Sequence, residues 1–286
     1  MTSKLIKNTL NLKNSDFKNL FDRVIEDLKS HPKVVGISLH GSLISGEQDE
    51  FSDVDLDILL WRNWKDWERM RKDFEKMVKG WPKPDPVVIK KRWYVLDLDW
   101  GIRIIGRYVF DFNFEPVQSF SIPEIEKVLS CEKLDTEGIR DIVEGKILYD
   151  PRNLFAEFKR KLRKYPPKLS RRIVEKRQSC LHEDYLMIKT NIGRRDLCAV
   201  AFSMAQFFED SAHLLFALNR QWYPGTKRLA KNLRRLKILP PDYVSLMEKA
   251  LHPTTINKPD DLEKIIDKLY SRIRSLHYPK EFQRLT

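Results

Sequence analysis

Residues 34–60 constrain the fold more than any other part of the sequence. They contain an apolar run at 34–40 (VVGISLH), the pair Gly41-Ser42, a polar loop, and the run VDLDILL at 54–60. In this last run apolar and acidic side chains alternate with a period of two, which is typical of a strand with one buried and one polar face. We therefore expect two strands of a sheet, with carboxylates gathered on one face.

Helical patterns surround these strands in the first half of the chain. Apolar side chains recur at helical spacing over 16–30 and 66–79, and the runs 93–98 and 102–114 predict two more strands. This mixture of helices and strands favours an α+β domain with a short mixed sheet flanked by helices, which we assign to residues 1–150.

The pattern of apolar residues in the second half of the chain, residues 151–286, is typical of a helical domain. Its widest apolar stripe covers 195–220, and the segments beyond Pro116 carry apolar residues at helical spacing. We expect an all-helical bundle here, with the boundary between the two domains near Asp150-Pro151.

The net charge also differs between these two halves. The chain carries 53 Lys and Arg against 41 Asp and Glu, a net charge of +12. Residues 1–150 contain 24 basic and 27 acidic side chains, whereas residues 151–286 contain 29 and 14. The positive second half suggests an anionic partner, with RNA as one candidate, and a Lys-rich solvated helix surface is the alternative.

Composition excludes several classes of protein. Hydrophobic residues make up 42% and charged residues 33% of the chain, which argues against disorder. No apolar run approaches the roughly 20 residues that a transmembrane helix needs. The cysteines Cys131, Cys180 and Cys198 are odd in number and lack the spacing of a zinc site. We expect a cytoplasmic protein with no membrane segment.

Two aspartates of the acidic run predict a metal site. Asp53 and Asp55 are two residues apart, so their carboxylates project from the same face of the strand. Such a pair is unfavourable unless cations lie between the groups, and oxygen ligands select hard ions such as Mg²⁺, with Mn²⁺ as an alternative. Gly41 lets the backbone approach a phosphate, and the Ser42 hydroxyl can help to hold a triphosphate.

A site with two metal ions usually needs a third carboxylate. Asp111 stands between Phe110 and Phe112, on the opposite side of the strand from this apolar pair. A carboxylate in an otherwise aromatic strand is explained if it completes the metal site. Asp97 and Asp99 compete for the same role, and Asp99 falls in a predicted turn.

Asp57 is a competing acid on the same strand. It is in phase with Asp53 and Asp55, but it would lie about 7 Å farther from the Gly-Ser end of the site than Asp55. We therefore favour the first two acids as ligands.

The spacing of Gly41-Ser42, Asp53 and Asp55, followed by Asp111 on a later strand, resembles the DNA polymerase beta-like nucleotidyltransferase superfamily. The segment 52–55 (SDVD) and the nearby Gly46 look especially like its minimal and antibiotic-type branches. In the second half, 146–155 and 217–236 look like segments that follow the catalytic domain in such enzymes. Many relatives carry an arginine before the loop glycine, where this chain has Ser45.

The resemblance implies a fold and a role for each matching residue. The first domain would be the nucleotidyltransferase core, and Gly41 and Ser42 would hold the nucleotide phosphates. Asp53 and Asp55 would bind two Mg²⁺ ions, and Asp111 would be the third ligand or the base.

The implied reaction moves a nucleoside monophosphate, expected to be AMP, from an NTP (ATP) to an acceptor hydroxyl and releases pyrophosphate. We expect the acceptor to be a small molecule. Transfer to a tRNA or other RNA 3′ end is an alternative, and so is transfer to a protein hydroxyl. A sensor that binds nucleotide or RNA without catalysis is the alternative from another class.

Three polar residues outside the carboxylate set each have two possible roles. Lys227 and Arg228 follow a Tyr-Pro-Gly turn, so they are either nucleotide-binding residues aimed at phosphate or ordinary surface charges. His40 precedes the glycine turn and either contacts the nucleotide or is a satisfied histidine at a strand end.

Overall fold

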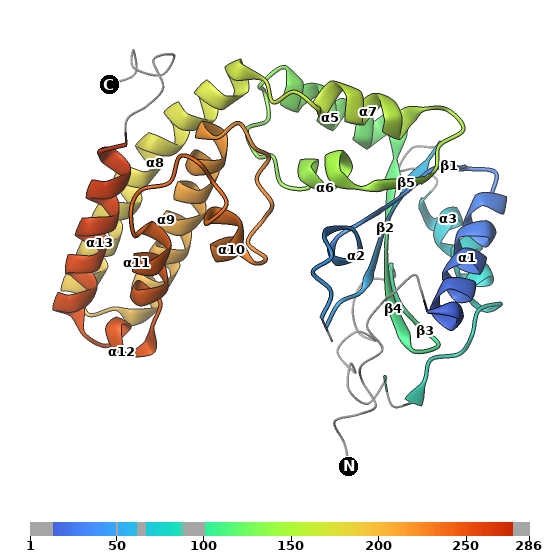
Figure 1. Cartoon of the computed structure of the whole chain (residues 1–286), viewed down its shortest axis with the longest axis horizontal. Coiled ribbons are helices and arrows are strands. Elements are labelled where there is room, and N and C mark those ends of the chain that lie inside the picture. Colours follow the sequence, from blue (N-terminus) through green and yellow to red (C-terminus); the bar gives the residue numbers. More distant parts are fainter. Residues whose placement is uncertain (1–13, 50, 62–66, 87, 89–100, 277–286) are drawn as a thin grey trace. The chain divides into compact units, whose positions relative to one another are not determined.

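The computed structural model describes residues 14–49, 51–61, 67–86, 88 and 101–276 (Figure 1). These residues form two compact units. The described residues of Met1–Lys127 and Asp141–Arg163 form the first, which we call the sheet unit. Those of Val128–Arg140 and Lys164–Thr286 form the second, the helical unit. Residues 151–163 thus belong to the sheet unit, although the predicted domain boundary lies at Asp150-Pro151.

The sheet unit is built on five strands in the order β3-β4-β2-β1-β5. β2 and β4 run parallel, and the other neighbouring pairs are antiparallel. The strands are β1 (Val34–His40), β2 (Val54–Leu60), β3 (Ile102–Ile105), β4 (Tyr108–Pro116) and β5 (Lys146–Tyr149). The chain therefore has the α+β architecture with a mixed sheet that the sequence predicts.

The strand predictions have different outcomes. The strands expected at 34–40 and 54–60 are confirmed as β1 and β2. The single strand expected over 102–114 is wrong, because the chain turns near Gly106 (φ 57°) and forms the antiparallel pair of β3 and β4. Glycine adopts this left-handed conformation without strain, and an apolar pattern does not reveal it. The strand expected at 93–98 lies outside the described residues.

One face of the sheet is apolar and packs against α1 (Ser15–Ser30) and α3 (Trp67–Val78) (Figure 1). Alternate side chains of β2 and β4 meet Phe17 of α1 and Phe74 of α3 in one hydrophobic cluster. Phe74 is fully buried, and its ring lies 5.1 Å from that of Phe112, centroid to centroid. Because side chains alternate along a strand, the residues between these positions project from the opposite face.

Short elements complete the sheet unit and lead into the helical unit. They are α2 (Ser42–Ser45), the π-helical turn η3 (Val117–Ser121), α5 (Ile122–Leu129), α6 (Ile139–Glu144) and α7 (Leu154–Leu162). Phe155 of α7 packs against β1 where Gly36 has no side chain. A Cβ at Gly36 would lie 2.9 Å from Cε2 of Phe155, so the glycine is needed for this contact.

The helical unit contains no strand among its described residues, in agreement with the predicted helical second half. Two long helices, α8 and α9, pack side by side, and the buried Asp210 of α9 forms an ion pair with Arg177 of α8. No helix in the described part of the chain is long and apolar enough to cross a membrane. The helices are α8 (Pro167–Gly193), α9 (Leu197–Leu218), α10 (Leu229–Leu233), α11 (Tyr243–Ala250), α12 (Pro253–Ile256) and α13 (Pro259–Arg274).

The aromatic cluster under the sheet predicts a large effect of one substitution. We expect Phe74→Ala to lower the free energy of unfolding by about 3–5 kcal/mol, because it removes a fully buried ring and leaves a cavity. Urea denaturation measures this change, and Lys72→Ala on the exposed side of α3 is the control. Equal stability of the two variants would contradict the packing described.

Candidate metal and nucleotide site

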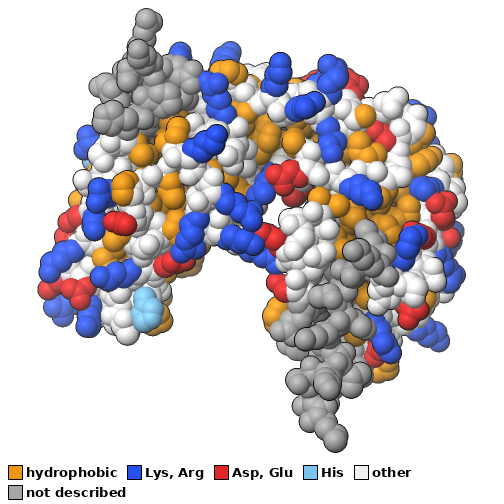
Figure 2. Space-filling view, viewed as in Figure 1, with side chains coloured by type: hydrophobic (Ala, Val, Ile, Leu, Met, Phe, Trp, Pro, Cys, Tyr) orange, Lys and Arg blue, Asp and Glu red, His pale blue; other side chains and the backbone are white. Residues whose placement is uncertain are grey.

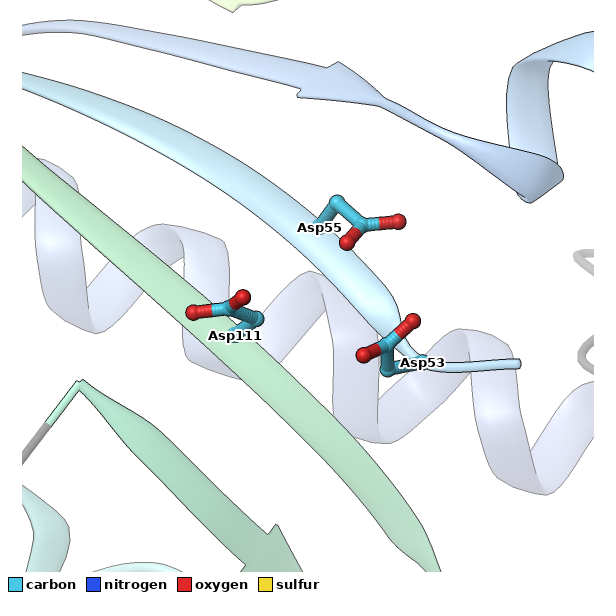
Figure 3. Close-up of side chains that lie close together, drawn as sticks. All are labelled: Asp53, Asp55 and Asp111. Carbon is cyan, nitrogen blue, oxygen red and sulfur yellow. The ribbon is translucent and has the colours of Figure 1, made fainter. Parts of the chain in front are cut away.

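Three carboxylates meet on the polar face of the sheet (Figure 3). Asp55 of β2 and Asp111 of β4 are direct neighbours in the parallel register, and Asp53 immediately precedes β2. Each offers one carboxylate oxygen, and these three atoms all lie within 4.8 Å of one another. The structure thus brings together the three acids that the sequence singled out.

The three carboxylates of this cluster repel one another. Two full charges at this separation repel by roughly 3 kcal/mol at an effective dielectric constant near 20. Each of the three side chains is half-buried, so water screens the repulsion only in part. Three carboxylate oxygens are ligands for a hard divalent cation, so the cluster is compatible with a metal site.

Gly41 lies directly against this cluster. Its backbone has φ 71° and ψ −150°, and a Cβ placed on it would lie only 1.9 Å from Oδ2 of Asp55. No other residue fits this position without displacing Asp55. The peptide that enters α2 is therefore held beside one of the predicted metal ligands.

Ser42 provides an unsatisfied polar atom at the same place. The residue is 4% exposed, and its buried Oγ has no hydrogen-bond partner among the residues that the structure describes. Buried hydroxyls without a partner are uncommon, and a ligand or ordered water is the usual explanation. Ser42 Oγ is thus suited to donate a hydrogen bond to an anionic oxygen of a bound molecule.

His40 and Asp57 form a polar contact beside the carboxylate cluster. His40 pairs with Asp55 across β1 and β2, and its Nε2 lies 3.1 Å from Oδ1 of Asp57. Burial lowers the pKa of His40, but the contact with Asp57 and the charges of Asp57, Asp141 and Asp55 outweigh it and raise the pKa to about 9. His40 therefore carries a positive charge at neutral pH.

A hydrogen-bonded chain continues from Asp57 along β4. Asn113 Nδ2 donates to Oδ1 of Asp57 at 3.0 Å and to Oε1 of Glu115 at 3.2 Å. Ser121 Oγ donates to Oε2 of Glu115 at 2.9 Å. Burial, together with the charge of Asp57, raises the pKa of Glu115. Asp57 is thus held by His40 and Asn113, and it is not part of the three-carboxylate group.

The other candidate residues lie elsewhere. Asp97 and Asp99 fall outside the described residues. Lys227 and Arg228 belong to the helical unit, where Lys227 is exposed and Arg228 precedes α10. Their role in nucleotide binding stays a prediction.

Sequence reasoning did not identify the hydrogen-bonded chain beside the carboxylate cluster. Alternation along the strand predicts that Asn113 and Glu115 lie on the same face as Asp111, but it does not predict their hydrogen bonds. His40 could be linked to Asp55 and Asp57 only through the register of β1 and β2.

The carboxylate cluster predicts opposite effects of charge removal and of metal. Without divalent ions, we expect Asp53→Asn to raise Tm by about 2–4 °C, because it relieves the repulsion. Adding Mg²⁺ should raise the Tm of the wild-type protein and leave that of the variant nearly unchanged. Glu126→Gln, an exposed isosteric change in α5, is the control for thermal denaturation. A wild-type Tm that does not respond to Mg²⁺ or Mn²⁺ would contradict a metal site.

The raised pKa of His40 predicts a pH-dependent stability. A group whose pKa is higher in the folded than in the unfolded state stabilises the fold below pH 6.5, and this contribution is lost as the pH rises through 9. We expect the free energy of unfolding of the wild-type protein to fall by on the order of 2–3 kcal/mol over this pH range. The variant His40→Gln should not show this fall. Urea denaturation in EDTA from pH 6 to pH 9.5 tests this, and parallel profiles of the two proteins would disprove it.

Comparisons with known proteins bear on both halves of the chain. A family model described as "Domain of unknown function (DUF4037)" matches residues 132–229, which lie mostly in the helical unit. A search of curated proteins found no match. Among solved structures, the chain is similar to a nucleotidyltransferase-like protein from Exiguobacterium sibiricum 255-15. The identity is 12% and the TM-score 0.43, over 89% of this chain and 74% of that one. A similarity of this size does not identify a function, so the function is inferred from the carboxylate geometry.

Proposed function

We propose that the chain is a metal-dependent nucleotidyltransferase. It would transfer a nucleoside monophosphate, AMP in our proposal, from an NTP to an acceptor hydroxyl. The acceptor oxygen attacks the α-phosphorus, the bond between this phosphorus and the bridging oxygen of the β-phosphate breaks, and pyrophosphate leaves. One observation carries the proposal. Three carboxylates, on β4, on β2 and directly before β2, offer oxygens within 4.8 Å of one another, beside a glycine that no larger residue can replace.

Each residue of the site has a role in this reaction. Asp53, Asp55 and Asp111 would hold two divalent cations, with Mg²⁺ as the ion we propose. When bound, these ions lower the pKa of the attacking hydroxyl and neutralise charge on the leaving pyrophosphate. Asp111 is suited to accept the proton of the acceptor at its carboxylate oxygen.

The Gly41-Ser42 segment would bind the nucleotide. Ser42 Oγ would donate its hydrogen bond to a phosphate oxygen, which would satisfy the buried hydroxyl. Gly41 permits the backbone to lie close to both the carboxylates and the phosphates. His40 would position rather than react, because its Nε2 lies 3.1 Å from Oδ1 of Asp57, which is outside the three-carboxylate group.

Transfer of a labelled nucleotide tests this proposal. Purified protein is incubated with Mg²⁺, one α-labelled NTP at a time, and cell extract separated into RNA, protein and metabolite fractions. We expect label in one fraction, with ATP as the preferred donor. The variant with Asp53→Asn and Asp55→Asn should lose more than about 100-fold in rate, because even outer-shell partners of a metal commonly contribute 10–100-fold.

A matched variant controls for the loss of two charges. Asp260→Asn with Asp261→Asn makes the same change at exposed positions of α13 and should keep full activity. Labelling by the double variant of the site at the wild-type rate would refute the proposal. Absence of label in every fraction, with NTP binding retained, would favour a nucleotide sensor instead.

A further inference from the structure

A second charged feature lies in the helical unit. We call Arg220–Lys237 the basic segment, because its 18 residues contain seven Lys and Arg and no Asp or Glu. All of these side chains are exposed except that of Arg228, which is half-buried. Figure 2 shows Lys and Arg side chains gathered where Figure 1 draws α10. The seven are Arg220, Lys227, Arg228, Lys231, Arg234, Arg235 and Lys237.

The basic segment is a closed and anchored loop. Asn219 joins its two ends, since Nδ2 donates to the carbonyl oxygen of Ile238 at 2.9 Å and Oδ1 accepts from the N–H of Ile238 at 2.8 Å. Its aromatic side chains are buried, as in the contact of Trp222 with Tyr165 at 4.5 Å between ring centroids. The cations are therefore presented from a fixed scaffold.

Two of the arginines occupy a backbone conformation that favours glycine. Arg220 has φ 52° and Arg228 has φ 56°, in the left-handed region that most side chains avoid. Arg220 follows the last turn of α9, where the N–H of Gln221 donates to the carbonyl oxygen of Phe216 at 3.0 Å, and Arg228 directly precedes α10. The backbone at both positions is therefore fixed by helix ends.

The arrangement of charge selects the kind of partner. Arg234 is held by Glu248, with its Nη2 at 2.8 Å from both carboxylate oxygens. The six other cations still exceed what one triphosphate can engage, so the segment fits an extended row of phosphates better. A membrane surface would need exposed apolar side chains for insertion, and those of the segment are buried or half-buried. A protein partner would need an exposed aromatic or apolar anchor at its centre, and the described surface of the segment offers none.

We propose that the basic segment binds the phosphate backbone of a nucleic acid. Such binding depends on charge and is largely independent of base sequence, because Lys and Arg contact phosphates rather than base edges.

Fluorescence anisotropy with a labelled 30-nucleotide single-stranded RNA of mixed sequence tests the binding. The full-length protein is compared with a triple variant, Lys227→Gln, Lys231→Gln and Arg235→Gln, over a series of salt concentrations. We expect at least a tenfold weaker binding at low salt. The slope of log affinity against log salt should also fall by about 2, since each lost contact to a single strand contributes about 0.7.

A second triple variant removes the same charge elsewhere in the helical unit. Lys249→Gln, Lys264→Gln and Lys268→Gln lie at exposed positions of α11 and α13 and should leave both affinity and slope unchanged. Lys227→Arg with Lys231→Arg keeps the charge and should keep the binding. Equal affinity of the two triple variants would overturn the proposal, as would preference for anionic phosphatidylserine vesicles or an acidic protein over RNA.

The proposed reaction needs a divalent metal, whereas the proposed RNA binding does not, so the two can be tested separately. Binding is measured in EDTA, where the Asp53→Asn/Asp55→Asn variant should bind RNA as tightly as the wild-type protein. RNA binding without any label transfer would leave the basic segment supported and refute the transferase. Label transfer to a metabolite without RNA binding would support the transferase and refute RNA binding by the basic segment.

Discussion

The parallel pairing of β2 with β4 is the constraint on which the candidate site depends. It places Asp55 beside Asp111, although the two residues are far apart in sequence. Like charges repel, and the aromatic packing of β4 against α3 on the opposite face helps to hold the two strands in register. The stability of the apolar face thus offsets repulsion on the polar face, and the same alternation that buries Phe110 and Phe112 places Asp111 on the polar face between them.

Much of this arrangement could be predicted from the sequence, because alternation is a local property. The runs 34–40 and 54–60 are strands as expected, and the acids at 53, 55 and 111 are found together. The hairpin between β3 and β4 could not be predicted, because it depends on the left-handed turn at Gly106 within a run that otherwise reads as one strand. The helical second half was predictable from its apolar periodicity.

The rest of the site depends on contacts between distant segments. His40 meets Asp57 only through the antiparallel register of β1 and β2, and Ser121 reaches Glu115 only through the turn after β4. The sequence predicts that Gly41 lets the backbone approach a phosphate. The structure adds a second reason for a glycine at this position, since a Cβ there would collide with Asp55. In the helical unit the positive charge was evident from composition, but the closure of the basic segment by Asn219 was not.

The division of the chain into two units has a consequence for synthesis on the ribosome. The sheet unit is interrupted by residues 128–140 of the helical unit, and its last strand, β5, pairs with β1 only when Lys146–Tyr149 has been made. Until then β1 is an edge strand with unpaired backbone groups, a known starting point for association with other chains. The sheet therefore cannot be completed before residues 128–140 of the helical unit have been made, so its last strand is added across a segment that belongs to the other unit.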